Sequence, residues 1–319
     1  MSIKYPFKLA EDLIPVLAAY KKQQTYPEGT KMELVFRQAL INGASQNMVQ
    51  SNETLTVENK YFTNKDDVKI QLRVYTPVTE KKNLPCLYWI HGGGTMSGLP
   101  EQDDQPISQL ARIAGCVVVS VNYRLAPENP YPKPVNDCYE GLEYIYNNPE
   151  EFGVDNQKIA VGGASAGGML TASCVIMARD RKGPKIVHQS LTYPMLDHRG
   201  LTDSSHEITN VGVWDRDMNL YGWQCYLSGV SENIPEAAVP MLARDLSGLP
   251  QAFLAVGTMD VLRDETIEYS QKLSAAGVPT ELHVYPGMVH VFDALAPTSK
   301  EAVDFSAARV SALLRAFAD

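Results

Sequence analysis

Hydrophobic and polar residues alternate with a period of two over residues 55–74, a pattern that predicts two half-exposed strands. Leu55, Val57 and Tyr61 alternate with polar residues, and after the polar turn 64–67 a second alternating run covers 68–74. Successive side chains of a strand point to opposite faces of the sheet. The segment is therefore predicted to form an antiparallel hairpin with one buried face.

The apolar segments that follow are continuous rather than alternating. Strands of this kind are buried on both faces, as in parallel sheets that are covered by helices. The expected strands are 86–90, 117–121, 159–161, 186–192, 252–256 and 281–285, and the helix-like segments between and after them are 107–113, 135–146, 166–180, 265–275 and about 300–317. This alternation predicts an α/β fold with a mainly parallel central sheet flanked by helices.

Two segments lie outside the alternation. Residues 1–50 look helical: a helical face is formed by Leu13, Ile14, Val16, Leu17 and Tyr20. In the same segment, Thr30 to Glu33 has the pattern of a capping box, and Gly43 is the predicted end of a second helix. These helices could serve either as a packing arm or as part of a lid.

About sixty residues separate Pro194 from the next expected strand, and they include Trp214 and Trp223. Connections this long usually carry a function or a structure of their own. We therefore predict a helical cap made of residues 1–50 and the inserted segment 196–235. The catalytic domain is then expected to comprise residues 51–195 and 236–319.

Composition restricts the partners. The chain has 28 basic and 37 acidic residues, a net charge of −9, which argues against nucleic acid or an anionic membrane as its main partner. No apolar run has signal-peptide or membrane-spanning length. The five cysteines are scattered singly, without the spacing of a metal site, and predict reduced, buried thiols. We expect a cytoplasmic enzyme without a structural zinc site.

The strongest chemical signal is Gly163-Ala-Ser165-Ala-Gly167, the chain's one Gly-x-Ser-x-Gly pentad. It lies between a short apolar strand and a helix that ends in basic residues, Gly183 and Pro184. A serine at such a sharp strand-to-helix turn is held out at the edge of the sheet, at the positive end of the helix dipole. Ser165 is the predicted nucleophile; the alternative is an ordinary glycine-rich connection.

A serine hydroxyl needs a base and a group that orients the base. Among six histidines, His290 follows the strand 281–285 through a short turn, so it emerges at the carboxyl edge of the sheet together with Ser165. The acid is expected after the preceding strand, where Asp260 comes first on the loop. Asp264 is the weaker candidate, because it begins a helix, where carboxylates are common as caps.

The developing oxyanion needs backbone N–H donors. Ala166, the residue after the serine, is expected to supply one. The loop His91-Gly-Gly-Gly94 directly follows a buried strand and is expected to supply the other, because glycine lets the backbone approach a substrate closely.

Five motifs in order resemble the hormone-sensitive lipase-like (family IV) carboxylesterases of the α/β-hydrolase fold. They are His91-Gly-Gly-Gly94, the 123–128 segment Tyr-Arg-Leu-Ala-Pro-Glu, the Ser165 pentad, the 260–265 segment Asp-Val-Leu-Arg-Asp-Glu and the His290 loop. The resemblance covers residues 55–315 and implies Ser165–His290–Asp260 as a triad, with Gly92, Gly93 and Ala166 as the oxyanion hole. It also implies a cap, no cofactor, and a homodimer formed through the last strand and neighbouring helices.

Two positions depart from the family pattern. Ala164 stands where the family has Asp or Thr, and Thr95-Met96 stands where an aromatic residue is common. Both border the family's substrate pocket, so the resemblance implies activity more directly than specificity. Arg124 and Glu128 are expected to form a structural charge pair near the serine.

These inferences predict a serine hydrolase of short- to medium-chain carboxylic esters that works through an acyl-enzyme. The alternatives are a catalytically silent ligand-binding protein on the same fold, an interfacial lipase and an acyltransferase. The small-molecule ester is the expected partner.

Overall fold

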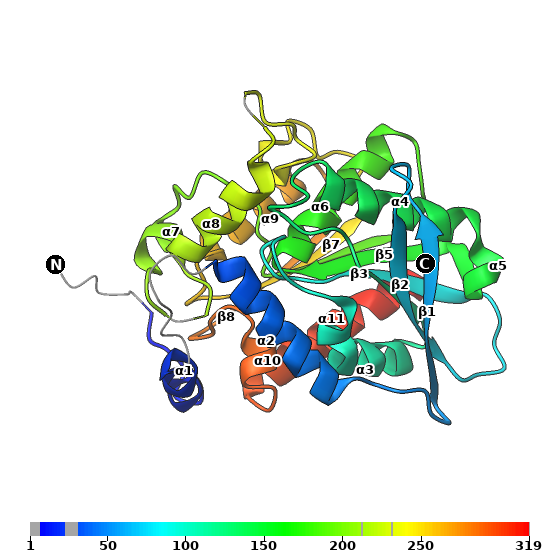
Figure 1. Cartoon of the computed structure of the whole chain (residues 1–319), viewed down its shortest axis with the longest axis horizontal. Coiled ribbons are helices and arrows are strands. Elements are labelled where there is room, and N and C mark those ends of the chain that lie inside the picture. Colours follow the sequence, from blue (N-terminus) through cyan, green and yellow to red (C-terminus); the bar gives the residue numbers. More distant parts are fainter. Residues whose placement is uncertain (1–6, 23–30, 212, 231, 319) are drawn as a thin grey trace.

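The computed structural model describes residues 7–22, 31–211, 213–230 and 232–318. Within them, eight strands form one sheet in the order β1-β2-β4-β3-β5-β6-β7-β8 (Figure 1). The strands are β1 Leu55–Thr63, β2 Lys69–Pro77, β3 Leu84–Ile90, β4 Val117–Val121, β5 Val154–Ala164, β6 His188–Thr192, β7 Gln251–Gly257 and β8 Thr280–Tyr285. The β1–β2 and β2–β4 pairs are antiparallel, and all other pairs are parallel. The predicted mainly parallel α/β fold is confirmed.

Helices cover both faces of this sheet. The helices of the described residues are α1 Leu13–Lys22, α2 Met32–Asn47, α3 Asp104–Ala114, α4 Lys133–Asn147, α5 Pro149–Phe152, α6 Ala166–Asp180, α7 Asp203–Glu207, α8 Arg216–Leu227, α9 Arg263–Ala275, α10 Phe292–Leu295 and α11 Lys300–Ala318. Two short 3₁₀ helices, η1 Pro100–Asp103 and η2 Pro240–Leu242, interrupt the loops. The expected helices 107–113 and 265–275 begin earlier than the hydrophobic pattern indicated.

Alternate residues of the central strands pack into two separate hydrophobic layers. On β3, Leu87 and Trp89 join the cluster that contains residues of α3 and α11, whereas Cys86, Tyr88 and Ile90 join the cluster on the α4 and α6 side. The period-two geometry of a strand thus explains why β3 has no polar face. The sheet is the middle layer between two helical layers.

The direction of strand order reverses at β3. The chain leaves β3, pairs β4 on one side of it, and later pairs β5 on the other side. At such a reversal the loops after adjacent parallel strands diverge and leave a crevice at the carboxyl edge, where ligands of open α/β sheets bind. The loops that follow β3 and β5 carry His91 and Ser165, so these residues are neighbours in space.

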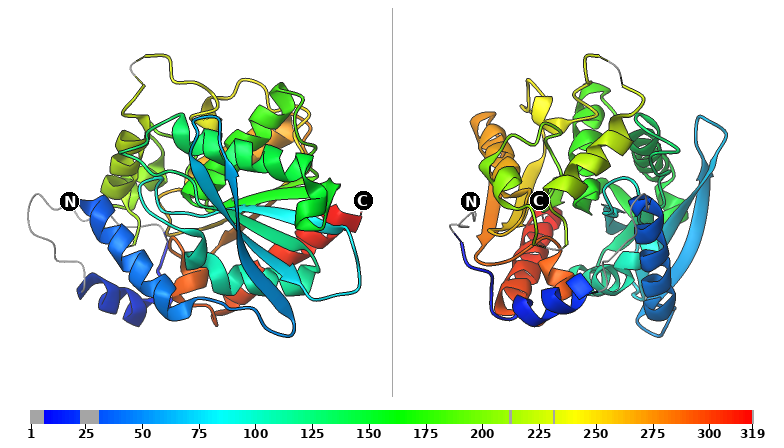
Figure 2. Two further views of the ribbon diagram at one scale, coloured as in Figure 1. Left: turned by 45° about the vertical axis from the view of Figure 1, so that its right-hand side comes forward. Right: turned by 60° about the vertical axis from the view of Figure 1, so that its left-hand side comes forward.

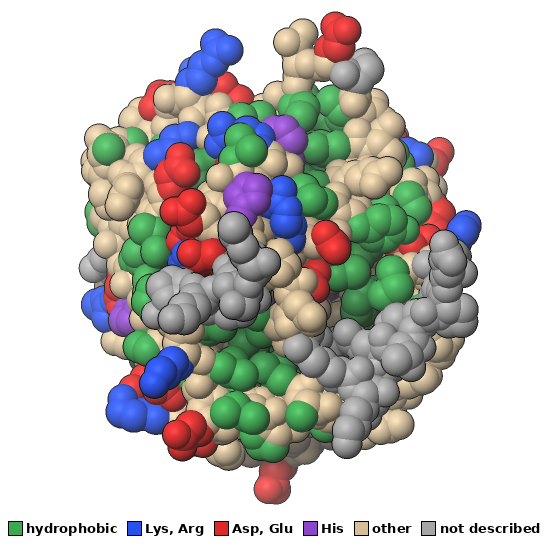
Figure 3. Space-filling model, turned by 90° about the vertical axis from the view of Figure 1, so that its left-hand side faces the viewer, with side chains coloured by type: hydrophobic (Ala, Val, Ile, Leu, Met, Phe, Trp, Pro, Cys, Tyr) green, Lys and Arg blue, Asp and Glu red, His purple; other side chains and the backbone are tan. Residues whose placement is uncertain are grey.

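In Figure 1 and in the left view of Figure 2, α7 and α8 lie toward the left-hand end of the molecule, above α1 and α2. Figure 3 faces this end and shows hydrophobic side chains gathered between charged ones. The inserted segment and the N-terminal helices are in direct contact, because the Tyr221 hydroxyl of α8 donates a 2.6 Å hydrogen bond to Glu33 of α2.

The beginning of α2 differs from the predicted capping box. Thr30 lies outside the described residues, and Lys31 occupies the N-cap position without a side-chain cap hydrogen bond. Glu33, which the capping box required to turn back to the backbone, accepts from Tyr221 instead. A tertiary contact has replaced the local one.

Gly43 does not end α2, contrary to the prediction. The helix continues to Asn47, and Gly43 keeps a negative φ, since it is absent from the positive-φ glycines of the described residues. A glycine stops a helix through the left-handed conformation, which Gly115 adopts at the end of α3 (φ 60°). In α1 the predicted apolar face is also only partly buried: Leu13 and Leu17 are buried, but Ile14 is 53% exposed.

All five cysteines are buried and unpaired, as predicted. Burial raises the pKa of the Cys116 thiol to about 12. No cluster of three metal-ligating side chains occurs in the described part of the chain. The helices of that part include none that is long and apolar enough to cross a bilayer.

Candidate active site

Ser165 occupies a strained turn between β5 and α6. Its φ of 58° and ψ of −120° lie outside the regions that a residue with a side chain favours. Three backbone hydrogen bonds hold it there: Ser165 N–H donates to Thr192, and the Ser165 carbonyl accepts from Met169 and Met195. Strain that the surroundings impose in this way is typical of functional residues.

The glycines on either side of Ser165 are required by contact. A β-carbon on Gly163 would collide with the Gly167 carbonyl, and one on Gly167 would collide with the Ile90 carbonyl at the end of β3. The turn after β5 therefore lies directly against the end of β3. Glycine at both positions is what permits the sharp strand-to-helix turn.

His290 reaches Ser165 from the loop after β8. Its Nε2 lies 2.9 Å from Ser165 Oγ, and its Nδ1 lies 2.8 Å from Asp260 Oδ2. All three side chains are at least 95% buried. The structure thus brings together the three residues that were predicted from separate parts of the sequence.

Asp260 is completely buried on the loop after β7. Its second oxygen, Oδ1, accepts the Leu262 N–H at 3.0 Å, so both carboxylate oxygens have partners. Met259 N–H donates to the Met288 carbonyl and joins the loop of the acid to the loop of the histidine. These contacts fix the direction in which the carboxylate faces His290.

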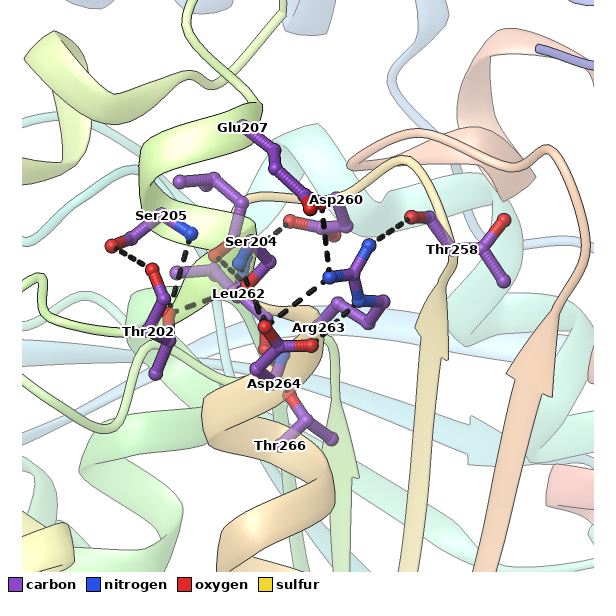
Figure 4. A network of polar contacts seen from close by, with 11 residues as sticks. Thr202, Ser204, Ser205, Glu207, Thr258, Asp260, Leu262, Arg263, Asp264 and Thr266 are labelled. Carbon is purple, nitrogen blue, oxygen red and sulfur yellow. Dashed lines mark hydrogen bonds and ion pairs between the residues drawn. The ribbon is translucent and has the colours of Figure 1, made fainter. Parts of the chain in front are cut away.

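Asp264 has a different role. It forms an ion pair with Arg263 and accepts the Ser204 N–H from α7 at 2.7 Å (Figure 4). Arg263 also pairs with Glu207 of α7 and donates to the Thr258 carbonyl. This network attaches the inserted segment to the loop that carries Asp260, and Asp264 makes no contact with His290 among the described hydrogen bonds.

The Gly92 and Gly93 carbonyls of the loop after β3 accept hydrogen bonds from within that loop. Gly92 carbonyl accepts from His91 Nδ1 at 2.9 Å, and Gly93 carbonyl accepts from Met96 N–H, Ser97 N–H and Ser97 Oγ. In a planar trans peptide the N–H points opposite to the carbonyl. The next N–H groups, those of Gly93 and Gly94, therefore face away from the interior of the loop.

Gly92 itself lies against the nucleophile, because a β-carbon there would be 3.3 Å from Ser165 Cβ. Ala166 is the first residue of α6, so its N–H belongs to the helix end, where backbone donors have no intrahelical acceptor. Among the hydrogen bonds of the described residues, none uses the N–H of Gly92, Gly93 or Ala166.

His91 supports the glycine loop rather than carrying charge. It is buried, and its ring stacks on Tyr123 with centroids 4.2 Å apart. Burial lowers the pKa of His91 to about 4, so the ring is neutral near pH 7. A neutral ring can donate one N–H to the Gly92 carbonyl, which fixes the position of the first glycine.

Comparison with known proteins places the chain in a family. A sequence model of the α/β-hydrolase fold matches residues 87–294. The carboxylesterase NlhH of Mycobacterium tuberculosis is 38% identical over 253 residues, which are 77% of this chain and 78% of that protein. The chain belongs to the α/β-hydrolase family. Its resemblance to the hormone-sensitive lipase-like group is confirmed.

Two further proteins that are similar to this α/β hydrolase are also esterases. An arylesterase of Saccharolobus solfataricus is 34% identical over 239 residues, or 74% of this chain and 77% of that protein. The structure of a bacterial heroin esterase superimposes with a TM-score of 0.89 and 34% identity, covering 98% of this chain and 99% of the other.

The predicted pairing of Arg124 with Glu128 is wrong. Arg124 binds Asp137 through two nitrogens and also pairs with Asp66. Glu128 instead pairs with Arg37 of α2. The two residues are four apart, but they lie in a loop rather than a helix, so the spacing does not place them on one face.

Two aromatic residues of the site were not recognised from the sequence. Tyr193, the residue before Pro194, packs edge-on against His290 and donates to Asp293 at 2.8 Å. Trp214 of the inserted segment lies over Gly94, where a β-carbon would collide with its ring, and its centroid is 6.1 Å from that of His290. An aromatic residue next to a proline or in a long insertion is a weak signal on its own.

Proposed function

We propose that this hydrolase is a serine carboxylesterase with Ser165 as nucleophile, His290 as general base and Asp260 as the group that orients the base. One observation carries the proposal: a continuous line of hydrogen bonds runs from Asp260 through His290 to the strained Ser165. The carboxylesterase and arylesterase among its relatives point to the same chemistry.

The geometry suits a two-step reaction. His290 Nε2 takes the Ser165 proton while Oγ forms a bond to the ester carbonyl carbon, and the same nitrogen then gives the proton to the alcohol as the carbon–oxygen bond breaks. In the second step His290 deprotonates water, which attacks the acyl-enzyme, and the proton returns to Ser165. Asp260 stabilises the imidazolium in both steps without taking the proton.

We propose an oxyanion hole at the backbone N–H groups of Gly92, Gly93 and Ala166. In its support, Gly92 packs against Ser165, and these N–H groups donate to no carbonyl of the described residues. The Gly93 carbonyl is fixed by its hydrogen bonds, and the N–H of the same peptide, that of Gly94, is a further donor on this loop. Donors held in place before the reaction cost no reorganisation when charge develops.

The cap is proposed to consist of residues 1–50 and 196–235, over a catalytic domain of 51–195 and 236–319. The Glu33–Tyr221 hydrogen bond supports a common unit, and the position of Trp214 over Gly94 supports its location above the site. A bulky indole in this place suits short- to medium-chain acyl groups. Cytoplasmic location and a homodimer through the edge strand β8 remain part of the same proposal.

A second candidate, an interfacial lipase, has one observation in its favour. Ile14, Leu34 and Ile41 on α1 and α2 are 50–53% exposed, and large exposed apolar side chains suit a lipid surface. The residues are separate rather than one continuous stretch, so we favour the esterase. An acyltransferase would use the same residues with an alcohol in place of water.

The test is hydrolysis of p-nitrophenyl esters from acetate to palmitate by the wild type and Ser165→Ala. We expect activity on the short chains and a loss of at least about 10³-fold in the variant. Emulsified tributyrin and an added alcohol acceptor distinguish the lipase and the acyltransferase. A folded wild type with no activity on any ester would favour the silent ligand-binding alternative.

A further inference from the structure

Arg37 on α2 binds two loops of the catalytic domain at once. Its Nε donates to the Met96 carbonyl at 2.7 Å, and one terminal nitrogen donates to the Ala126 carbonyl at 2.7 Å. Both terminal nitrogens also bind Glu128, at 2.9 and 2.7 Å. Four of the five N–H donors of the guanidinium are thus engaged.

The two loops that Arg37 binds are also joined to each other. Ala126 N–H donates to the Thr95 carbonyl at 2.9 Å, and Thr95 holds a positive φ of 62°. Thr95 and Met96 directly follow the three glycines, which include the loop's donors in the proposed oxyanion hole. A shift of the Met96 peptide would therefore move the end of the glycine loop.

The inserted segment contacts α2 on the same face of the helix that carries Arg37. Glu33 lies one turn before Arg37 and accepts the Tyr221 hydroxyl of α8. Residues four apart on a helix lie side by side, so this face of α2 touches α8 at Glu33 and the catalytic loops at Arg37. The helix is a direct link between the inserted segment and the glycine loop.

The ion pair alone does not explain the arrangement. The Glu128 side chain is 54% exposed, and an exposed ion pair of this kind contributes about 0–1 kcal/mol to the stability of the fold. The two carbonyl hydrogen bonds are part-buried and depend on a planar fork of fixed geometry. Glu128 orients that fork, and the carbonyl bonds position the loops.

We infer that Arg37 is a positioning residue for the glycine loop, so that full hydrolytic activity requires α2 to be seated on the catalytic domain. The inference rests on the proposed function only for its effect on the rate. The ordering of residues 92–98 by Arg37 is a separate property that does not depend on the reaction.

The experiment compares Arg37→Met, Arg37→Lys and Glu128→Gln with a matched control, Arg179→Met. Arg179 is exposed to nearly the same extent, 23% against 22%, and likewise binds two backbone carbonyls and a carboxylate, but it lies at the far end of α6. Two quantities are measured: kcat and KM for p-nitrophenyl butyrate, and hydrogen–deuterium exchange of the peptide that covers 92–98.

We expect Arg37→Met to lower kcat about tenfold with little change in KM, because the donors act on the transition state. Exchange in 92–98 should accelerate while exchange in β5 and β6 stays unchanged. Arg37→Lys should not restore either property, since a lysine lacks the planar fork that spaces separate donors over the two carbonyls and Glu128, and Glu128→Gln should have a smaller effect than Arg37→Met. Arg179→Met should change neither.

Unchanged exchange in 92–98 for Arg37→Met would overturn the inference, and so would faster exchange that spreads equally over the sheet. An equal loss of kcat in Arg179→Met would also overturn it, because Arg37 would then act only as a general stabilising contact. A wild type without esterase activity would contradict the proposed function, while the exchange measurement would still decide whether Arg37 positions the loop.

Discussion

The ring of Tyr193 packs edge-on against the ring of His290, with centroids 4.7 Å apart and planes at 63°. The hydroxyl of the same tyrosine donates to Asp293, three residues beyond the histidine. Tyr193 therefore contacts the histidine loop at two points.

Tyr193→Phe keeps the ring contact but removes the hydroxyl bond. We expect kcat to fall about 3- to 10-fold with KM nearly unchanged, because His290 loses part of its orientation. Steady-state kinetics on a short-chain ester measures both constants. Asp293→Asn is the control, since its amide oxygen still accepts the hydroxyl; a large loss in this variant and none in Tyr193→Phe would contradict the argument.

The two aspartates of the 260–265 segment should differ in their effects on catalysis and on stability. Asp260→Asn should lower kcat by about 10³- to 10⁴-fold, because the amide no longer stabilises the imidazolium. Asp264→Asn should leave kcat within about threefold and lower the stability of the fold instead, since Asp264 binds Arg263 and Ser204. Kinetics and urea unfolding of both variants test this; a reversed order would assign the acid to Asp264.

Trp214 should limit the size of the acyl group. Replacing it by leucine in Trp214→Leu opens space over Gly94, so kcat/KM for octanoate relative to butyrate should rise about tenfold. Trp223→Leu is the matched control, because Trp223 is buried nearby but packs on His198 and Tyr226. An unchanged chain-length profile in Trp214→Leu would show that other residues line the acyl pocket.

Stability should fall with acid through His188. This side chain is 2% exposed, and neither ring nitrogen has a partner among the described residues. Burial lowers the pKa of His188 to about 4, with Glu281 opposing and Arg315 assisting the shift. Since the unfolded chain binds this proton near pH 6.5, stability is complete above that pH and is lost as pH falls toward 4.

In the wild type, His188 should lower the free energy of unfolding by an amount on the order of 3 kcal/mol between pH 7 and pH 4, and His188→Leu should not show this decrease. His91, with its pKa also lowered to about 4, contributes in the same range, so part of the acid sensitivity should remain. Urea unfolding of the wild type and His188→Leu at pH 7.5, 5.5 and 4.5 measures the difference. Parallel curves for the two proteins would contradict the role of His188.

The order of elements and the three contacting residues Ser165, His290 and Asp260 were predictable from the sequence. Each follows a strand with a clear apolar pattern, and parallel strands bring their carboxyl ends to one edge. The contacts of Arg37, Tyr193 and Trp214 were not predictable. They join segments whose separation in sequence carries no periodic signal.

The wrong predictions share a cause. The helix end at Gly43 and the Arg124–Glu128 ion pair were predicted from local spacing, and the role of Glu33 was predicted from a local capping pattern. In the structure Gly43 stays helical, Arg124 binds Asp137, and Glu33 binds Tyr221. In each case a tertiary partner or a continued helix is preferred over the short-range pattern, which is only a weak local preference.

The contact between Glu33 and Tyr221 has a consequence for biosynthesis. The two residues are 188 positions apart. At the usual pace of translation, Glu33 is made roughly 10 to 40 s before Tyr221. During that interval α2 has left the ribosome without its partner on α8. The helices that are synthesised first are therefore among the last to reach their final contacts.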